Sequence, residues 1–238
     1  MDDVTTLRAD VIVAGAGIGG LTAAGSAQEA GAKVVLLEKA PTIGGSAAVS
    51  GGTVWCAANL DAWLSVQPDA EPALGKALID NFLEGIDWLR EQGVAADRLT
   101  DEVPYKFERV VYALRPDARS AMDTLAQRIT AGGGAIYTRA RLRDLRLDSR
   151  GRVSGVLALG PDGFLDVSAP SVVLATGGFQ GNPDLRARYL GRWSDRMGSN
   201  SLERVLNDTR WGLGDHNLPE VKIAPGGRNL PRAAATRP

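Results

Sequence analysis

Three glycines near the N-terminus, Gly15, Gly17 and Gly20, have the spacing G-x-G-x-x-G. The carboxylate of Glu38 follows about twenty residues later. Because glycine has no Cβ, such a turn lets the backbone approach a pyrophosphate, and the free amides at the start of a following helix can bind its oxygens. A carboxylate at position 38 can accept hydrogen bonds from ribose hydroxyls and would repel a 2′-phosphate. These residues predict a nucleotide site and argue against NADP.

The flanking residues predict the elements that would position this site. Residues 11–14 are a short apolar run, typical of a buried parallel strand. Small or apolar residues then recur at helical spacing, at Leu21, Ala24, Ala27 and Ala30. Gly31 ends this helix, and residues 33–37 form a second apolar strand that ends at Glu38. Glycines that merely join a strand to a helix are the alternative, but all four features agree on a βαβ nucleotide-binding unit.

Residues 39–53 are dense in glycine and small side chains and predict a loop that lies against a ligand. Gly44, Gly45, Gly51 and Gly52 would let the backbone approach, and Ser46 would supply a donor. A flexible surface linker is the alternative, but a linker would not normally follow a ribose-binding acid directly.

The middle of the chain predicts helices and then short strands. Residues 61–93 have a helical pattern, and a second helix begins with Ser120 as its cap. Three arginines before it could touch an anionic substrate, although a solvated charge is the commoner role: Arg109, Arg115 and Arg119. Four short β segments, at residues 135–137, 140–147, 153–159 and 164–167, are then separated by turn sequences, as expected for an antiparallel meander.

Residues 171–179, SVVLATGGF, predict a return to the parallel sheet. The strand at 172–174 runs directly into Thr176 and Gly177, which places these residues at the carboxyl end of the sheet, where ligands bind in such folds.

Together, GAGIGG with EK, PTIGGSAAVSGG and ATGG resemble the FAD-dependent flavoproteins of the fumarate reductase and succinate dehydrogenase family, which includes ketosteroid and tricarballylate dehydrogenases. The resemblance implies an α/β fold: a Rossmann-like FAD-binding domain with a parallel sheet, helices on both faces and an interrupting antiparallel meander. It implies FAD as the cofactor, with a backbone contact to adenine at Leu142. The implied FAD-binding residues are Gly15, Gly17, Gly19, Gly20, Glu38, Lys39, Gly45, Ser46, Ala47, Gly51, Gly52, Leu142, Thr176 and Gly177.

The resemblance ends at about Ser201. We therefore expect an incomplete FAD-binding domain over residues 1–200, with its meander at about 140–167, and a divergent, poorly ordered tail over 201–238 that contains the single histidine, His216. In the family a cap domain and a returning C-terminal segment bear the residues that protonate and clamp the substrate. Because nothing here matches them, we predict no catalytic residue and expect a truncated or frame-shifted form of a longer gene.

The family implies hydride transfer between flavin N5 and a small saturated or α,β-unsaturated carbonyl or carboxylate compound. An FAD-binding fragment without activity is the alternative. An NAD-dependent dehydrogenase is a weaker alternative, because the GGSAAVSGG loop has no role in an NAD site.

Composition adds expectations about partners and location. A net charge of −1 gives no electrostatic reason to expect a nucleic-acid partner. Cys56 is the only cysteine, which excludes an intrachain disulfide and a cysteine metal cluster. The N-terminus lacks the features of a secretion signal, and no apolar run approaches membrane-spanning length, so we expect a cytoplasmic protein with no membrane segment.

Overall fold

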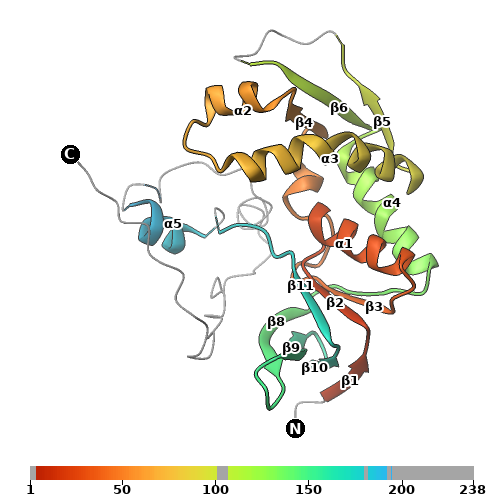
Figure 1. The fold of residues 1–238 in the computed structure, drawn as a ribbon. Helices are drawn as coiled ribbons and strands as arrows, with labels where there is room; N and C mark the ends of the chain where they lie inside the picture. The colour runs from red at the N-terminus through yellow and green to blue at the C-terminus, as the bar shows by residue number, and fades with distance from the viewer. Residues whose placement is uncertain (1–3, 101–106, 180–181, 192–193, 195–238) are drawn as a thin grey trace.

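The computed structural model describes residues 4–100, 107–179, 182–191 and 194. Its centre is a four-stranded parallel sheet in the order β11-β2-β3-β7 (Figure 1). The strands are β2 (Val11–Ala14), β3 (Val34–Leu37), β7 (Ala135–Tyr137) and β11 (Ser171–Leu174). Strands β2 and β3 are almost continuously apolar and buried, because other layers cover both faces of the sheet.

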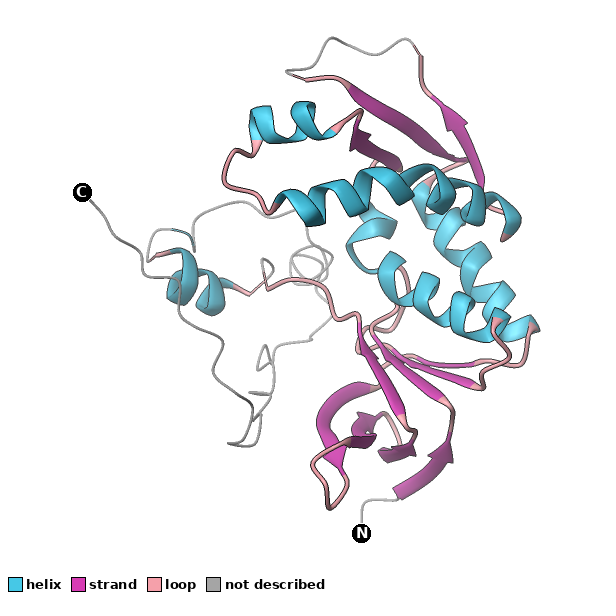
Figure 2. Ribbon diagram, in the orientation of Figure 1, coloured by secondary structure: helices cyan, strands magenta, loops and turns pink. Residues whose placement is uncertain are grey.

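Helices α1 (Ile18–Glu29) and α4 (Ala118–Ala131) pack on one face of this sheet (Figure 2). Their buried side chains, including Leu21 of α1 and Met122 of α4, form one core with Val13 and Leu36 of the sheet. The N-cap of α4 is Asp117 rather than the predicted Ser120, because the Asp117 carboxylate accepts a hydrogen bond from the Ser120 amide.

A second sheet, antiparallel except at one edge, covers the other face. Its strands are β1 (Val4–Arg8), β10 (Gly163–Ser168), β9 (Val153–Gly160) and β8 (Arg141–Leu147), in that order, and β1 pairs in parallel with β10. Ile12 and Val35 of the parallel sheet pack there with Val156 and Val167 of the antiparallel sheet. The predicted α/β fold with an antiparallel meander is confirmed. In the described residues, however, helices cover one face of the parallel sheet, and this meander takes the place of the expected second helical layer.

A third sheet, in the order β4-β6-β5, lies beside α3 (Pro72–Glu91) and α2 (Leu60–Val66) (Figure 1). Its antiparallel strands are β4 (Thr53–Ala57), β5 (Ala95–Arg98) and β6 (Arg109–Arg115). The helical pattern predicted over 61–93 is therefore two helices. Pro72 begins the second helix, since proline disfavours a helical conformation in the residue before it, and Glu71 caps it.

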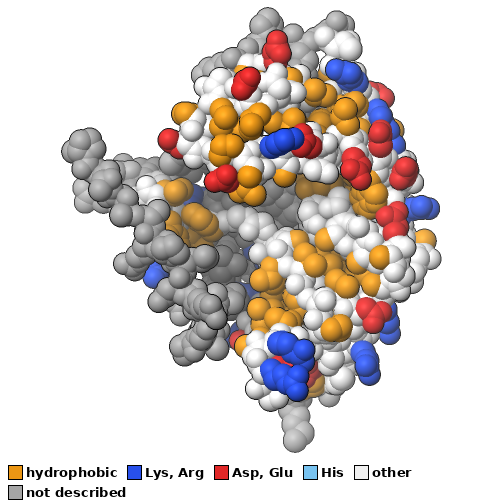
Figure 3. Space-filling view, in the orientation of Figure 1, with side chains coloured by type: hydrophobic (Ala, Val, Ile, Leu, Met, Phe, Trp, Pro, Cys, Tyr) orange, Lys and Arg blue, Asp and Glu red, His pale blue; other side chains and the backbone are white. Residues whose placement is uncertain are grey.

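Two short helices complete the described elements, the 3₁₀ helix η1 (Gly45–Val49) and α5 (Pro183–Leu190). Acidic and basic side chains are interspersed with apolar areas on the face shown in Figure 3. Within the described ranges, we find no helix with the length and apolar character needed to span a membrane. The predicted tail, 201–238, and His216 lie outside the described residues.

Candidate functional site

The first glycine of the predicted motif lies where two neighbouring strands end. Gly15 follows β2 with a φ of 103°, and a Cβ built on it would lie 2.3 Å from the carbonyl oxygen of Ala175, which follows β11. A side chain at this position would therefore collide with backbone. The loops after β2 and β11 can touch at the carboxyl end of the sheet because residue 15 is glycine.

Helix α1 starts directly after this contact. Gly17 is its N-cap and supplies no side-chain hydrogen bond to the first turn, so no side-chain cap competes with a ligand for those amides. Gly20 lies in the first turn, where a Cβ would be 1.7 Å from the Gly15 carbonyl oxygen. Gly19, by contrast, has nothing within 4 Å of its missing Cβ. The fold itself requires glycine at position 20 and does not require it at position 19.

The second glycine-rich loop lies against the first. The Gly44 amide donates to the Ala16 carbonyl oxygen at 2.7 Å, and Gly44 forms an isolated parallel bridge with Gly17. A Cβ on Gly45 would lie 3.2 Å from the Gly17 Cα. Two segments that the sequence predicted separately as ligand-binding loops therefore lie against each other.

The remaining predicted residues of this loop differ in their surroundings. Ser46 is exposed and Ala47 is half-buried, both in η1. Gly51 is exposed with nothing within 4 Å of its missing Cβ. Gly52 is buried with a φ of 74°, and a Cβ there would lie 3.2 Å from the Ala118 amide nitrogen at the start of α4. Gly52 therefore has a packing role, whereas Gly51 has none in the described residues.

Glu38 is buried at the end of β3, and both of its carboxylate oxygens accept backbone hydrogen bonds. Oε2 accepts from the Ala16 amide at 2.7 Å and Oε1 from the Ala40 amide at 2.8 Å. These bonds offset the cost of burying the charge and tie the loop after β2 to the loop after β3. Each oxygen keeps a second lone pair, so the predicted bonds from ribose hydroxyls are compatible with this role. Lys39, next to it, is exposed.

The predicted adenine contact lies on a different sheet from the glycine loops. Leu142 is in β8, paired with Ala158, and is half-buried against the core of the antiparallel sheet. Just before β8, the Ala140 amide donates a hydrogen bond to the Glu38 carbonyl oxygen at 2.8 Å. Thr176 and Gly177 are exposed directly after β11, beside Gly15 in the fold.

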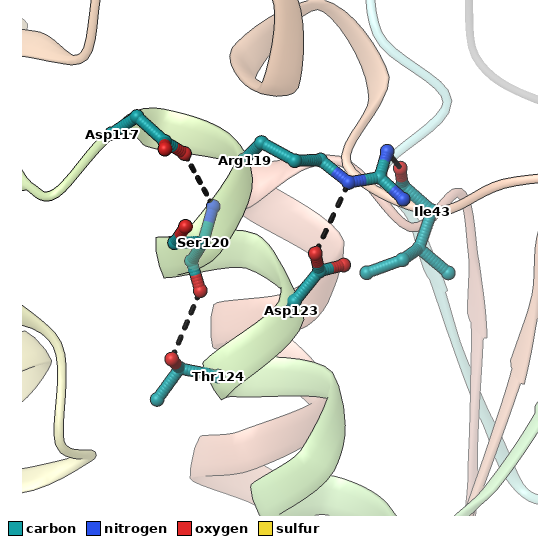
Figure 4. Close-up of polar contacts among 6 residues, drawn as sticks. All are labelled: Ile43, Asp117, Arg119, Ser120, Asp123 and Thr124. Carbon is teal, nitrogen blue, oxygen red and sulfur yellow. Dashed lines mark hydrogen bonds and ion pairs between the residues drawn. The ribbon is translucent and has the colours of Figure 1, made fainter.

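The start of α4 contacts the second loop (Figure 4). Arg119 Nη1 donates to the Ile43 carbonyl oxygen at 3.0 Å, and its Nε donates to Asp123 Oδ2 at 3.2 Å. The hydrogen bond from the Ser120 amide holds the pKa of the Asp117 carboxyl below its ordinary value. Sequence reasoning missed the contact of Arg119 with the loop, since its acceptor is a backbone atom 76 positions away.

These features fit a dinucleotide. Two glycine backbones approach without side chains, the N-terminus of α1 has no side-chain cap, and a buried carboxylate adjoins both loops. Amides suit a pyrophosphate, and a carboxylate with free lone pairs suits ribose hydroxyls.

A family model described as FAD binding domain matches residues 10–215. This chain belongs to that family of FAD-binding flavoproteins. Its cofactor is FAD, as the resemblance predicted, and the predicted membership of the fumarate reductase and succinate dehydrogenase family of flavoproteins is confirmed.

Among curated relatives, "Fumarate reductase (cytochrome)" of Shewanella frigidimarina is 31% identical over an alignment of 201 positions that covers 75% of this chain and 35% of that protein. "NADH:acrylate oxidoreductase" of Vibrio harveyi is 28% identical over a gapped alignment of 263 positions that covers 78% of this chain and 26% of that protein. The chain thus spans between about a quarter and about a third of the length of these relatives.

Solved structures of flavoproteins have a similar fold. The open conformation of a flavocytochrome c3 fumarate reductase superposes with a TM-score of 0.72 at 25% identity, covering 83% of this chain and 38% of that one. A 3-ketosteroid-delta4-(5alpha)-dehydrogenase of Rhodococcus jostii RHA1 gives a TM-score of 0.69 at 23% identity, covering 83% of this chain and 52% of that one, and supports the fold alone.

Proposed function

We propose that this chain forms the FAD-binding part of an oxidoreductase of the fumarate reductase type. In this proposal hydride passes between flavin N5 and a small saturated or α,β-unsaturated carbonyl or carboxylate compound. The observation that supports it best is the meeting of the two glycine loops at Gly17 and Gly44, beside Glu38. The names of the relatives, which include reductases of fumarate and oxidoreductases of acrylate, favour this substrate class.

In this proposal the described residues bind and orient the cofactor. The amides at the start of α1 and of η1 would bind the pyrophosphate, and Glu38 would accept from the adenosine ribose. Ser46, Ala47, Gly51 and Gly52 would follow the ribityl chain, with Thr176 and Gly177 on the side of β11. Bound FAD supplies the hydride chemistry. No described residue is assigned a catalytic role.

A second candidate is FAD binding without turnover. The observation that favours it is that the contacts described for this site, the bridge between Gly17 and Gly44 and the hydrogen bond to Glu38, suit a cofactor. Substrate-binding residues in the remainder of such proteins would then be required for the reaction.

Two measurements on the purified chain test both candidates. The absorption spectrum, followed by analysis of the flavin released on denaturation, reports whether FAD is bound. The chain is then reduced without oxygen and mixed with fumarate or acrylate. Reoxidation of the flavin by the enoate supports the proposed reaction, and bound FAD that stays reduced supports the second candidate. Colourless protein that takes up no added FAD would contradict both.

A pair of carboxylate variants tests the site. Glu38→Gln replaces one acceptor oxygen with an NH₂ group that faces a backbone amide, so FAD affinity should fall by about tenfold or more. Asp10→Asn is the matched control, since Asp10 Oδ2 accepts from the Lys33 amide at 2.8 Å just before β2, at the opposite end of that strand. Equal FAD affinity of the two variants would contradict the role given to Glu38.

A further inference from the structure

One peptide group in the second loop is held from both sides. Its carbonyl oxygen, on Ile43, accepts from Arg119 Nη1 at 3.0 Å (Figure 4). Its amide, on Gly44, donates to the Ala16 carbonyl oxygen at 2.7 Å. Because the C=O and N–H of a trans peptide point in opposite directions in one plane, these two bonds together fix the orientation of that plane.

The loop sequence cannot fix this orientation by itself. Gly44 and Gly45 have φ values of 105° and 52°, both in the left-handed region. Glycine populates that region and its mirror image about equally, so the peptide before Gly44 can rotate at little steric cost. Ala48 Cβ and Met122 Cγ lie 2.5 and 3.3 Å from the missing Cβ of Gly44, so a side chain would not fit there, whereas glycine does. Hydrogen bonds must therefore select the conformation that brings Gly44 and Gly45 against Gly17.

Arg119 is itself well placed for this task. Its Nε donates to Asp123 Oδ2 one turn along α4, which leaves Nη1 directed at Ile43. The Asp117 cap fixes the first turn of the helix, on which Arg119 lies. A guanidinium offers several donors in one plane and can hold a carboxylate and a carbonyl oxygen at once.

The same network continues to the ribose-binding acid. Ala16 accepts from Gly44 through its carbonyl and donates through its amide to Glu38 Oε2 at 2.7 Å. Ala16 therefore links the Ile43–Gly44 peptide to Glu38. A change in the orientation of that peptide would also shift the loop before α1 and its hydrogen bond to Glu38.

We propose that Arg119 is a positioning residue for FAD, which locks the Ile43–Gly44 peptide so that both glycine loops keep the shape that receives the pyrophosphate. This inference rests on FAD binding and is independent of the redox reaction proposed above.

The test compares two arginine variants of α4. Arg119→Met removes the donors and keeps the length of the side chain, and Arg128→Met is the matched control, since Arg128 is exposed on the same helix. We expect FAD affinity of Arg119→Met to be about tenfold below that of Arg128→Met, the effect of one hydrogen bond from a charged donor. Arg119→Lys should recover part of the loss. The two apo variants should unfold at similar urea concentrations, because the Arg119–Asp123 pair is half-exposed.

A second measurement distinguishes positioning from simple stabilisation. The network predicts that Arg119→Met and Glu38→Gln are non-additive in FAD affinity, whereas Arg128→Met and Glu38→Gln are additive. Equal affinities of the Arg119→Met and Arg128→Met variants would overturn the proposal, as would a loss that lysine does not recover and that matches the loss of apo stability. FAD-saturated protein without enoate turnover would contradict the proposed reaction alone.

Discussion

The glycine at position 20 provides the sharpest test of the site geometry. A Cβ on Gly20 would lie 1.7 Å from the carbonyl oxygen and 2.9 Å from the carbonyl carbon of Gly15, both backbone atoms. Real Cβ atoms do not approach closer than 3.0 Å, so Gly20→Ala must separate α1 from the loop after β2 by at least 1.3 Å, the difference between 3.0 and 1.7 Å. No side-chain rotation can relieve this contact.

That displacement has a cost in stability. Leu21 and Ala24 of α1 are fully buried against the parallel sheet, and moving the helix loosens their packing. Overpacking of this kind costs about 1–3 kcal/mol, and we expect the upper end because the obstacle is backbone. For a domain of this size that loss lowers the melting temperature by about 6–12 °C. FAD affinity should fall as well, since the Gly15 loop and the amides of α1 move apart.

The matched control is the neighbouring residue. Gly19 has nothing within 4 Å of its missing Cβ and lies in the same helical turn, so Gly19→Ala should leave the apo protein equally stable or stabilise it by about 0.5–1 kcal/mol. Both variants and the parent are compared by urea unfolding without FAD, and Gly20→Ala and the parent are then compared by FAD titration. Equal stability of the Gly20→Ala and Gly19→Ala variants without FAD would contradict the close packing of α1 against Gly15.

Three further predictions concern the surrounding fold. Cys56 is buried in β4 and burial raises the pKa of its thiol, so a thiol reagent at neutral pH should label it only as the protein unfolds; rapid labelling of folded protein would contradict this. The pKa of Asp117 is held low by the Ser120 amide, so its contribution to stability is present above about pH 4 and lost as the pH falls through the folded value. The stability of the Asp117→Asn variant should therefore fall less than that of the parent as the pH is lowered below about 4. Equal losses of stability in the two proteins, measured by urea unfolding, would contradict the capping role of Asp117. Asn59→Ala should cost about 1 kcal/mol in urea unfolding, since Asn59 Oδ1 accepts from Ala62 at the start of α2, and Asn59→Asp should restore most of it.

Local signals in the sequence predicted the elements that position the site. The apolar run at residues 11–14 coincides with β2, and Gly31, which follows α1, has a φ of 84°. Three of the four predicted meander segments were found within about one residue, because turn residues separate short apolar runs there. The fourth, residues 135–137, was wrongly placed in the meander, since it forms β7 and pairs in parallel with β3. Periodicity and turn chemistry depend on near neighbours, so they can be recognised without the fold.

Pairings between distant segments had no such signal. Strand β1 is mostly exposed, yet it pairs in parallel with β10. The place of β6 between β4 and β5 depends on two partners distant from each other in sequence. Arg119 was expected to be solvated or to meet an anionic substrate, but its acceptor is the Ile43 carbonyl. Every residue has a backbone carbonyl, so the sequence does not indicate which one accepts this hydrogen bond. The fold is needed to identify it.

The glycines of the site divide by the reason for their presence. At Gly15 and Gly20 the chain itself excludes a side chain, since backbone atoms occupy the space. At Gly19 nothing in the described residues does so, and glycine inside a helix costs about 1 kcal/mol relative to alanine. A residue that weakens its own helix and fills no packing requirement needs another reason, and we infer that this reason is the close approach of FAD to the start of α1. The sequence motif alone does not distinguish these glycines. Their surroundings do, since Gly15 and Gly20 are required by backbone packing, whereas we assign Gly19 to the approach of the ligand.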